Sequence, residues 1–250
     1  MRITFLGTGT SHGVPMLGCT CRVCTSTDPR NRRTRPSLLL QGEKQIIIDT
    51  SPDFRTQLIR HPIPRLDAVL FTHFHTDHIL GLDDLRPFNY WQEGPIPIYA
   101  NARTLERIRQ VFAYIFDPGT YEGAPNLAVH QIEGPFDIDG ILVEPLQVFH
   151  GQLEILGFRI QDFAYITDAS FLPETTLAKI ENIGCLVINA LRYQPHPMHF
   201  SLEQSLRQIE KINPGRAFLT HVAHQLSHQE VEDTLPARVR MAYDGLTVEV

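Results

Sequence analysis

The chain has 250 residues, a formal net charge of −6 at pH 7, 42% hydrophobic residues and 20% charged residues. This composition is ordinary for a soluble globular protein, and the length allows a sizeable buried core. The mildly acidic balance argues against a broad nucleic-acid-binding surface. Arg30, Arg32, Arg33 and Arg35 make a short basic patch, which we expect to be a solvated loop.

The first residues, Met1 to Gly7, are not expected to be a signal peptide. The N-terminal residues run into a Gly-Thr turn without the long apolar region of a signal peptide. No stretch approaches the length of a transmembrane helix. We therefore expect a cytoplasmic protein with no membrane partner, folded as one domain over residues 1–250.

Strand and helix patterns alternate along the chain, which predicts an α/β fold. Residues 117–126 are rich in Gly and Pro and are expected to be a surface loop. Ser201 and Gln204 have the spacing of a capping box. The expected strands are Ile3–Leu6, Ser37–Leu40, Gln45–Ile48, Ala68–Phe71, Ile96–Ala100, Ile141–Phe149, Gly157–Ile160, Ala164–Thr167, Cys185–Asn189, Ala217–Thr220 and the edge strand Leu246–Val250. The expected helices are Pro52–Arg60, Thr104–Ile115, Pro173–Ile183 and Ser201–Ile212, with a further helical pattern through Leu80, Leu82 and Leu85.

The run His-Phe-His-Thr-Asp-His at residues 73–78 places four potential metal ligands directly after an apolar strand. Imidazole and carboxylate groups suit zinc, iron and manganese. In an extended backbone His73 and His75 project the same way. Asp77 and His78 lie one turn further on and can face a second metal. The alternative is a histidine-rich solvated loop.

This H-x-H-x-D-H run resembles the signature of the metallo-β-lactamase superfamily. The resemblance implies a four-layer αβ/βα sandwich with a two-metal site at one edge of the sheets. It also implies three later ligands, each placed just after an expected strand: His150, Asp168 and His221. By the same resemblance one metal takes His73, His75 and His150, the other takes Asp77, His78 and His221, and Asp168 bridges them.

Cys19, Cys21 and Cys24 form a C-x-C-x-x-C pattern. In a cytosolic chain, three closely spaced thiols favour a zinc site over a disulfide, although one ligand is missing. His12 or His224 can supply it; the alternatives are unligated thiols or a redox pair. Cys185 lies in an apolar strand and is expected in the core.

The Gly-Thr-Gly-Thr turn at residues 7–10, Gly13-Val14-Pro15, the cysteines and the run at 219–225 are similar to one branch, the phosphoribosyl 1,2-cyclic phosphate phosphodiesterases. The resemblance implies a structural zinc on the three cysteines and His224, and two divalent ions, zinc or manganese, at the active site. It gives His199 a role as proton donor or phosphate ligand, with Asp77 also counted as catalytic. The expected partner is a small, cyclic phosphodiester, of the phosphoribosyl 1,2-cyclic phosphate or the 2′,3′-cyclic nucleotide class, and a homodimer stays open.

Several other functions remain open at this stage. A tRNase Z-like endoribonuclease uses the same ligand set, but no inserted segment here matches its tRNA-docking arm. The pyrroloquinoline quinone biosynthesis relative also carries a cysteine–zinc motif, and fold alone does not exclude a metal-binding protein without catalysis. Thioester and β-lactam hydrolysis use related sites, but the Asp in the fourth position and the cysteines favour phosphodiesters.

Overall fold

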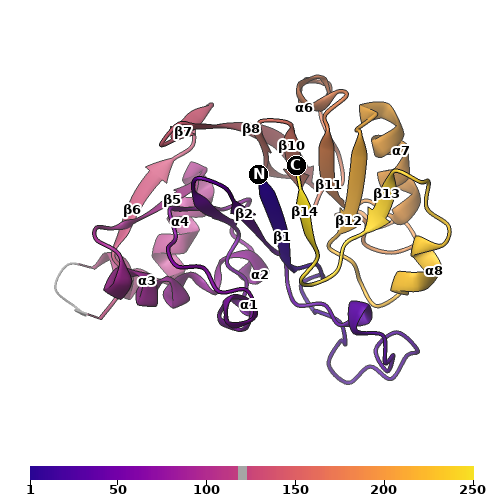
Figure 1. Cartoon of the computed structure of the whole chain (residues 1–250), viewed down its shortest axis with the longest axis horizontal. Coiled ribbons are helices and arrows are strands. Elements are labelled where there is room, and N and C mark those ends of the chain that lie inside the picture. Colours follow the sequence, from indigo (N-terminus) through magenta and orange to yellow (C-terminus); the bar gives the residue numbers. More distant parts are fainter. Residues whose placement is uncertain (118–122) are drawn as a thin grey trace.

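The computed structural model describes residues 1–117 and 123–250, and their strands form two seven-stranded sheets (Figure 1). The first sheet has the order β14-β1-β2-β3-β4-β5-β6 and the second β13-β12-β11-β10-β9-β8-β7. The strands of the first are β1 (Arg2–Gly7), β2 (Ser37–Gln41), β3 (Gln45–Ile48), β4 (Ala68–Leu70), β5 (Ile96–Ala100), β6 (Leu127–Gln131) and β14 (Thr247–Glu249). Those of the second are β7 (Phe136–Ile138), β8 (Ile141–His150), β9 (Leu153–Ile160), β10 (Phe163–Ile166), β11 (Cys185–Asn189), β12 (Arg216–Thr220) and β13 (Val239–Met241).

Helices cover the outer faces of both sheets. Figure 1 shows α1 to α4 on one side of the molecule and α7 and α8 on the other, with the strands between them. Two short 3₁₀ helices lie at Pro29–Asn31 and Leu82–Leu85. The α-helices are α1 (Phe54–Arg60), α2 (Thr76–Ile79), α3 (Arg86–Trp91), α4 (Ala102–Val111), α5 (Ala113–Phe116), α6 (Glu174–Ile180), α7 (Leu202–Ile212) and α8 (His228–Glu232).

Each of the two sheets has an antiparallel half and a parallel half. In the first, β1, β2, β3 and β14 pair antiparallel, and β3 to β6 pair parallel. In the second, β7 to β10 pair antiparallel, and β10 to β13 pair parallel. The carboxyl ends of parallel strands lie at the same edge of a sheet, where functional groups gather in α/β folds.

Three buried apolar layers hold the sheets and helices together. The strand β3 contributes side chains to two of these layers. Ile46 and Ile48 belong to the layer between the sheets, whereas Ile47 belongs to the layer between the first sheet and α1 to α4. A third layer lies between the second sheet and α6 to α8. Because side chains alternate along a strand, a continuous apolar run fits a strand that is buried on both faces. This is the αβ/βα sandwich that the family resemblance implied.

Most expected elements are present, with differences at helix boundaries. Ser201 caps α7 with the predicted capping box, and β14 pairs with β1 as an edge strand. The predicted helix 104–115 is two helices, because the backbone of Phe112 (φ −113°, ψ 41°) leaves the helical region. The leucine pattern after residue 79 forms a 3₁₀ turn. The strands β6, β7 and β13 and the helices α3 and α8 were not predicted.

The arginine patch differs from the expected solvated loop. Arg33 is buried, and its guanidinium donates to Thr8 Oγ1 at 2.7 Å and to the carbonyl oxygen of Ala242 at 2.6 Å. Arg30 and Arg35 form ion pairs with Asp28 and Asp53. Arg33 and Arg35 therefore tie the N-terminal loop to the rest of the domain, whereas the Arg30 ion pair lies within the loop.

The predicted surface loop and the predicted lack of membrane-spanning helices can be compared with the structure only in the described residues. In the predicted loop 117–126, residues 118–122 lie outside the described residues. Across the described part of the chain, the helices are too short or too polar to cross a lipid bilayer.

Candidate metal centre

Side chains from both sheets converge at the edge where the parallel strands end. His73 and His75 follow β4, and Asp77 and His78 lie in α2. From the second sheet, one residue ends β8 and two more follow β10 and β12. These seven residues, which the sequence singled out, are His73, His75, Asp77, His78, His150, Asp168 and His221.

The first group contains His73, His75 and His150. One ligand atom from each lies within 4.8 Å of the others. The Nε2 atom of His73 is buried and has no hydrogen-bond partner among the described residues. Burial lowers the pKa of His73 well below its ordinary value, so the ring is neutral and its nitrogen lone pair can bind a cation.

The second group is more strongly charged. His78 Nε2 lies 3.4 Å from Asp77 Oδ2 and 3.3 Å from Asp168 Oδ2, and His221 Nε2 lies 3.2 Å from Asp168 Oδ1. Burial alone would lower the pKa of His78, but the carboxylates of Asp77, Asp168 and Asp49 raise it well above its ordinary value. Buried carboxylates at this density require positive charge between them.

Hydrogen bonds orient the imidazole rings toward this centre. The Nδ1 of His150 donates to the carbonyl oxygen of Met198 at 2.7 Å, and the Nδ1 of His78 donates to Asp49 Oδ2 at 2.8 Å. Thr72 Oγ1 donates to Asp49 and lies 3.0 Å from the Nδ1 of His73. With Nδ1 engaged in this way, Nε2 is the ring nitrogen that faces the centre.

Asp49 is the site residue that sequence reasoning missed. It follows β3, is fully buried, and accepts hydrogen bonds from the backbone nitrogen and hydroxyl of Thr72 as well as from His78. Burial raises the pKa of this carboxyl group against the opposing effect of His78. The available signal was an acidic residue directly after an apolar strand, much as Asp168 lies two residues after β10.

Three residues of the site share an uncommon backbone conformation. Asp49, Asp168 and His221 have φ angles of 63°, 57° and 54°. Left-handed backbone is uncommon outside glycine, although Asp and His adopt it more readily than most residues. Each of the three directly follows or lies close after a buried parallel strand, so the left-handed turn redirects the side chain toward the centre.

His199 lies against both groups without a hydrogen bond to either among the described residues. Its ring centroid is 4.6 Å from that of His150 and 5.0 Å from that of His221, and its Nδ1 lies 3.6 Å from Asp168 Oδ1. Burial lowers the pKa of His199 to about 3, partly offset by Asp168. The imidazole is therefore neutral at pH 7 in the free protein.

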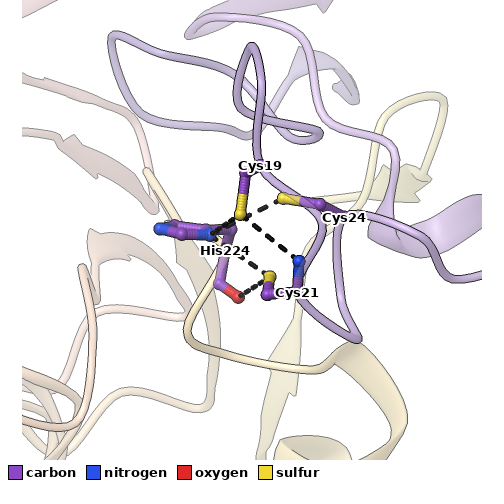
Figure 2. A group of neighbouring side chains, drawn as sticks. All are labelled: Cys19, Cys21, Cys24 and His224. Atoms are coloured by element: carbon purple, nitrogen blue, oxygen red, sulfur yellow. Dashed lines mark hydrogen bonds between the residues drawn. The ribbon is translucent and has the colours of Figure 1, made fainter.

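The cysteines meet His224 as the resemblance implied (Figure 2). His224 Nδ1 lies 3.3 Å from the sulfur of Cys19, 3.3 Å from that of Cys21 and 3.6 Å from that of Cys24. A hydrogen bond from the Cys24 backbone lowers the pKa of Cys21 to about 6, and burial raises that of Cys24 to about 11. His12, the other candidate for the fourth ligand, lies outside this cluster. Cys185 is in the core, as expected.

The donor sets fit metal ions at both places. Buried imidazole nitrogens without partners, together with carboxylate oxygens, suit zinc, manganese or iron. Three sulfurs and one nitrogen within 4.8 Å of one another suit a closed tetrahedral zinc site. The seven residues at the strand ends can thus hold divalent ions, and the cysteine cluster can hold a structural zinc.

Comparison with known proteins agrees with this geometry. The family model "Beta-lactamase superfamily domain" matches residues 44–222. A solved structure of a diphosphatase from the PhnP family is 39% identical, with a TM-score of 0.94, and the match covers 100% of this chain and 97% of that one. Zinc-bound PqqB from Methylobacterium extorquens (22% identity, TM-score 0.79, 100% of both chains) and the short form of human tRNase Z (19%, 0.74, 100% of this chain and 99% of that one) share the fold.

The chain therefore belongs to the metallo-β-lactamase superfamily, in its PhnP-like branch. A Porphyromonas gingivalis protein named octanoyltransferase is 41% identical over 252 residues, which cover 98% of this chain. The chain spans about half of that relative, 51% of its length.

Proposed function

We propose that this protein is a metal-dependent hydrolase of small phosphodiesters, most of all cyclic ones, with two divalent ions at the strand-end centre and a structural zinc at the cysteines. The observation that carries the proposal is the position of His199. It packs on His150 and His221, lies beside Asp168, and also lines a pocket of about 270 Å³. His199 thus lies between that pocket and the strand-end residues, so a substrate that extends from the centre into the pocket would contact it.

The chemistry of the residues follows from these positions. Two divalent ions held by His73, His75, His150 and by Asp77, His78, His221, with Asp168 shared, would supply charge neutralisation for a phosphodiester and acidify water. Asp49 and Thr72 hold the rings of His78 and His73 in place. The negative charge of a bound phosphodiester favours the protonated form of His199, which can then give its proton to the departing oxygen.

A comparison of leaving groups tests the role of His199. We expect His199→Ala to slow a ribose cyclic phosphate, whose alkoxide needs a proton, by about a hundredfold to ten-thousandfold, the usual effect of general acid catalysis. Bis-p-nitrophenyl phosphate should lose much less, because p-nitrophenolate leaves without a proton. The measurement is kcat of the metal-loaded variant on both substrates. Equal losses on both would mean that His199 binds phosphate instead.

The substrate class is tested on the wild-type protein. Hydrolysis of cyclic phosphodiesters that is lost on metal removal supports the proposal. Cleavage of precursor tRNA without turnover of cyclic phosphates would favour the tRNase Z-like alternative. If neither cyclic phosphodiesters nor precursor tRNA are hydrolysed, a metal-binding protein without catalysis is favoured.

The Porphyromonas relative favours one second candidate, the hydrolysis or transfer of an octanoyl ester by the same centre. Its name describes a protein about twice as long, so the activity can belong to the other half. Histidine and arginine side chains line the pocket beside His199, which suits a phosphate better than an eight-carbon chain. An octanoyl thioester in the same assay distinguishes the two.

A further inference from the structure

A pocket of about 240 Å³ lies on the helix-facing side of the first sheet, between its antiparallel strands and the end of α1. In β1, Ile3 and Phe5 point into the layer between the sheets. Because side chains alternate along a strand, Arg2 and Thr4 point to the opposite face and line the pocket. Leu39 of β2 belongs to the layer beneath the helices and lines the pocket as well.

This pocket lies at the opposite end of the strands from the candidate metal centre. The strands β1 and β3 run in the same direction, because both pair antiparallel with β2. The pocket is built on the start of β1 and the end of β2, whereas Asp49 follows the end of β3 and the histidine run follows the end of β4. A ligand in this pocket would therefore be separate from the metal ions and from their substrate.

The lining of the pocket is positively charged. Arg2, Arg60 and His61 line it, and its described lining residues include no Asp or Glu. The other lining residues are Thr4, Leu39, Gln41, Pro62 and Thr247. The whole chain has 28 acidic residues against 22 Lys and Arg, so this composition runs against the net charge of the protein. A cavity lined by one sign of charge attracts ligands of the other sign, here anions.

Neither arginine of the pocket forms an ion pair with a described acidic residue. The Nε of Arg2 donates to Gln41 Oε1 at 3.1 Å, so the side chain leans toward β2 and away from Glu249, its cross-strand neighbour on β14. Arg60 is the last residue of α1, and its side chain has no hydrogen bond to a described residue. Both arginines are exposed and keep guanidinium donors for a ligand. Guanidinium groups in this state bind phosphate well.

Two hydroxyl groups and an imidazole add neutral donors. Thr4 is 3% exposed, and its Oγ1 lies 3.0 Å from that of Thr247. One of the two hydroxyl hydrogens is used in that bond, so the other can be donated to a ligand. A Cβ on Gly245 would lie 3.4 Å from His61 Nε2, so the imidazole ring packs closely against this glycine. Burial and the charge of Arg60 lower the pKa of His61, so the arginines carry the positive charge of the pocket.

We propose that this pocket binds the phosphate group of a small ligand, either inorganic phosphate or a phosphomonoester. Arg2 and Arg60 supply the charged donors, and Thr4, Thr247 and His61 supply the neutral ones. A tetrahedral phosphate can accept from donors on several sides at once, which a planar carboxylate cannot. The volume is below the range of about 300–1,000 Å³ that is usual for drug-sized ligands, which favours a small occupant. The site does not depend on the proposed hydrolase activity.

The ring signals of His61 in a proton NMR spectrum test this site apart from the metal centre. They are assigned by their loss in His61→Asn. Inorganic phosphate and ribose 5-phosphate, each titrated at fixed ionic strength, should shift these signals saturably in the millimolar range or below. Arg2→Gln and Arg60→Gln should each weaken the binding about tenfold, the low end of what a charge-assisted hydrogen bond contributes. Tighter binding of ribose 5-phosphate would assign a phosphomonoester, and equal binding would assign inorganic phosphate.

Arg55→Gln is the matched control, because Arg55 is an exposed arginine of the same helix that does not line the pocket. It should leave the affinity unchanged. An equal loss in Arg55→Gln and Arg60→Gln, or the same shifts with chloride, would mean general electrostatic attraction and would overturn the site. His61 signals that do not move with either phosphate would also overturn it. Shifts produced only by a DNA duplex would overturn the assignment of a small ligand.

Discussion

At the scale of single residues, the centre depends on side chains that do not touch the reacting atoms. Asp49 fixes the ring of His78 and, through Thr72, that of His73. Partners of this kind hold a metal-ligating imidazole in one tautomer and orientation. A carboxylate in this position also adds negative charge to a buried site, which strengthens cation binding.

Asp49→Asn should therefore weaken metal binding at the position of His78 by about 10- to 100-fold while the fold is retained. The amide keeps the shape but loses the charge. Competition with a chromogenic chelator measures the affinity, and circular dichroism checks the fold. Asp67→Asn is the matched control, because Asp67 is also buried beside a strand but lies before β4 and bonds to the backbone of Gln45. Unchanged affinity in Asp49→Asn, or an equal loss in Asp67→Asn, would contradict this role.

The run from His73 to His78 was a local signal for metal-binding side chains. His150, Asp168 and His221 were expected only through the family resemblance, and the structure brings them to the same strand-end edge. Asp49 was not predicted, because its function comes from contact with Thr72 and His78 across the sheet. The left-handed backbone conformation of Asp49 and Asp168 could not be predicted either, because composition and periodicity carry no signal for it.

At the scale of elements, strands were easier to predict than helices. Buried parallel strands such as β11 are continuous apolar runs, and β11 has the predicted bounds. The helices α2, α3 and α5 are short and depend on packing rather than propensity, so their ends do not follow from the leucine and isoleucine spacing. The strand β6 is only half-buried and ends in exposed polar residues, which removes the apolar signal.

The cysteine cluster links two elements that are far apart in the sequence. It joins the loop of residues 19–24 to the segment after β12 through His224. The contribution of zinc at this cluster to stability is testable, because an ion that binds only the folded protein adds its binding energy to the free energy of unfolding. Cys21→Ser should lower the melting temperature by about 2–4 °C for each kcal/mol of binding energy lost. Differential scanning calorimetry and zinc content are the measurements.

A matched control for this prediction is Cys185→Ser, which changes a buried thiol that lies in the core, away from the cluster. It should keep the zinc, whereas Cys21→Ser should lose it. Turnover of bis-p-nitrophenyl phosphate per active-site metal should change little in Cys21→Ser. Unchanged zinc content and stability in Cys21→Ser would rule out a metal at the cysteines.

At the scale of the whole molecule, the strand-end centre joins the two sheets. The first sheet and the helix after it supply His73, His75, Asp77 and His78, and the second supplies His150, Asp168 and His221. Both sheets repeat the same antiparallel and parallel halves, so their functional edges meet. Ions bound there would link the two sheets at an edge where buried charges otherwise oppose folding.

Loading the strand-end centre should therefore stabilise the whole fold, not only the site. An ion present at 100 times its dissociation constant adds about 2.7 kcal/mol to the free energy of unfolding. For a chain of this size that corresponds to a rise of roughly 5–10 °C in melting temperature. The measurement is a thermal melt of protein stripped with a mild chelator and then titrated with zinc or manganese. Asp168→Ala should show a reduced rise and bind at least one ion fewer, because its carboxylate faces both His78 and His221. A full rise and full activity in Asp168→Ala would show that Asp168 does not bridge the two ions.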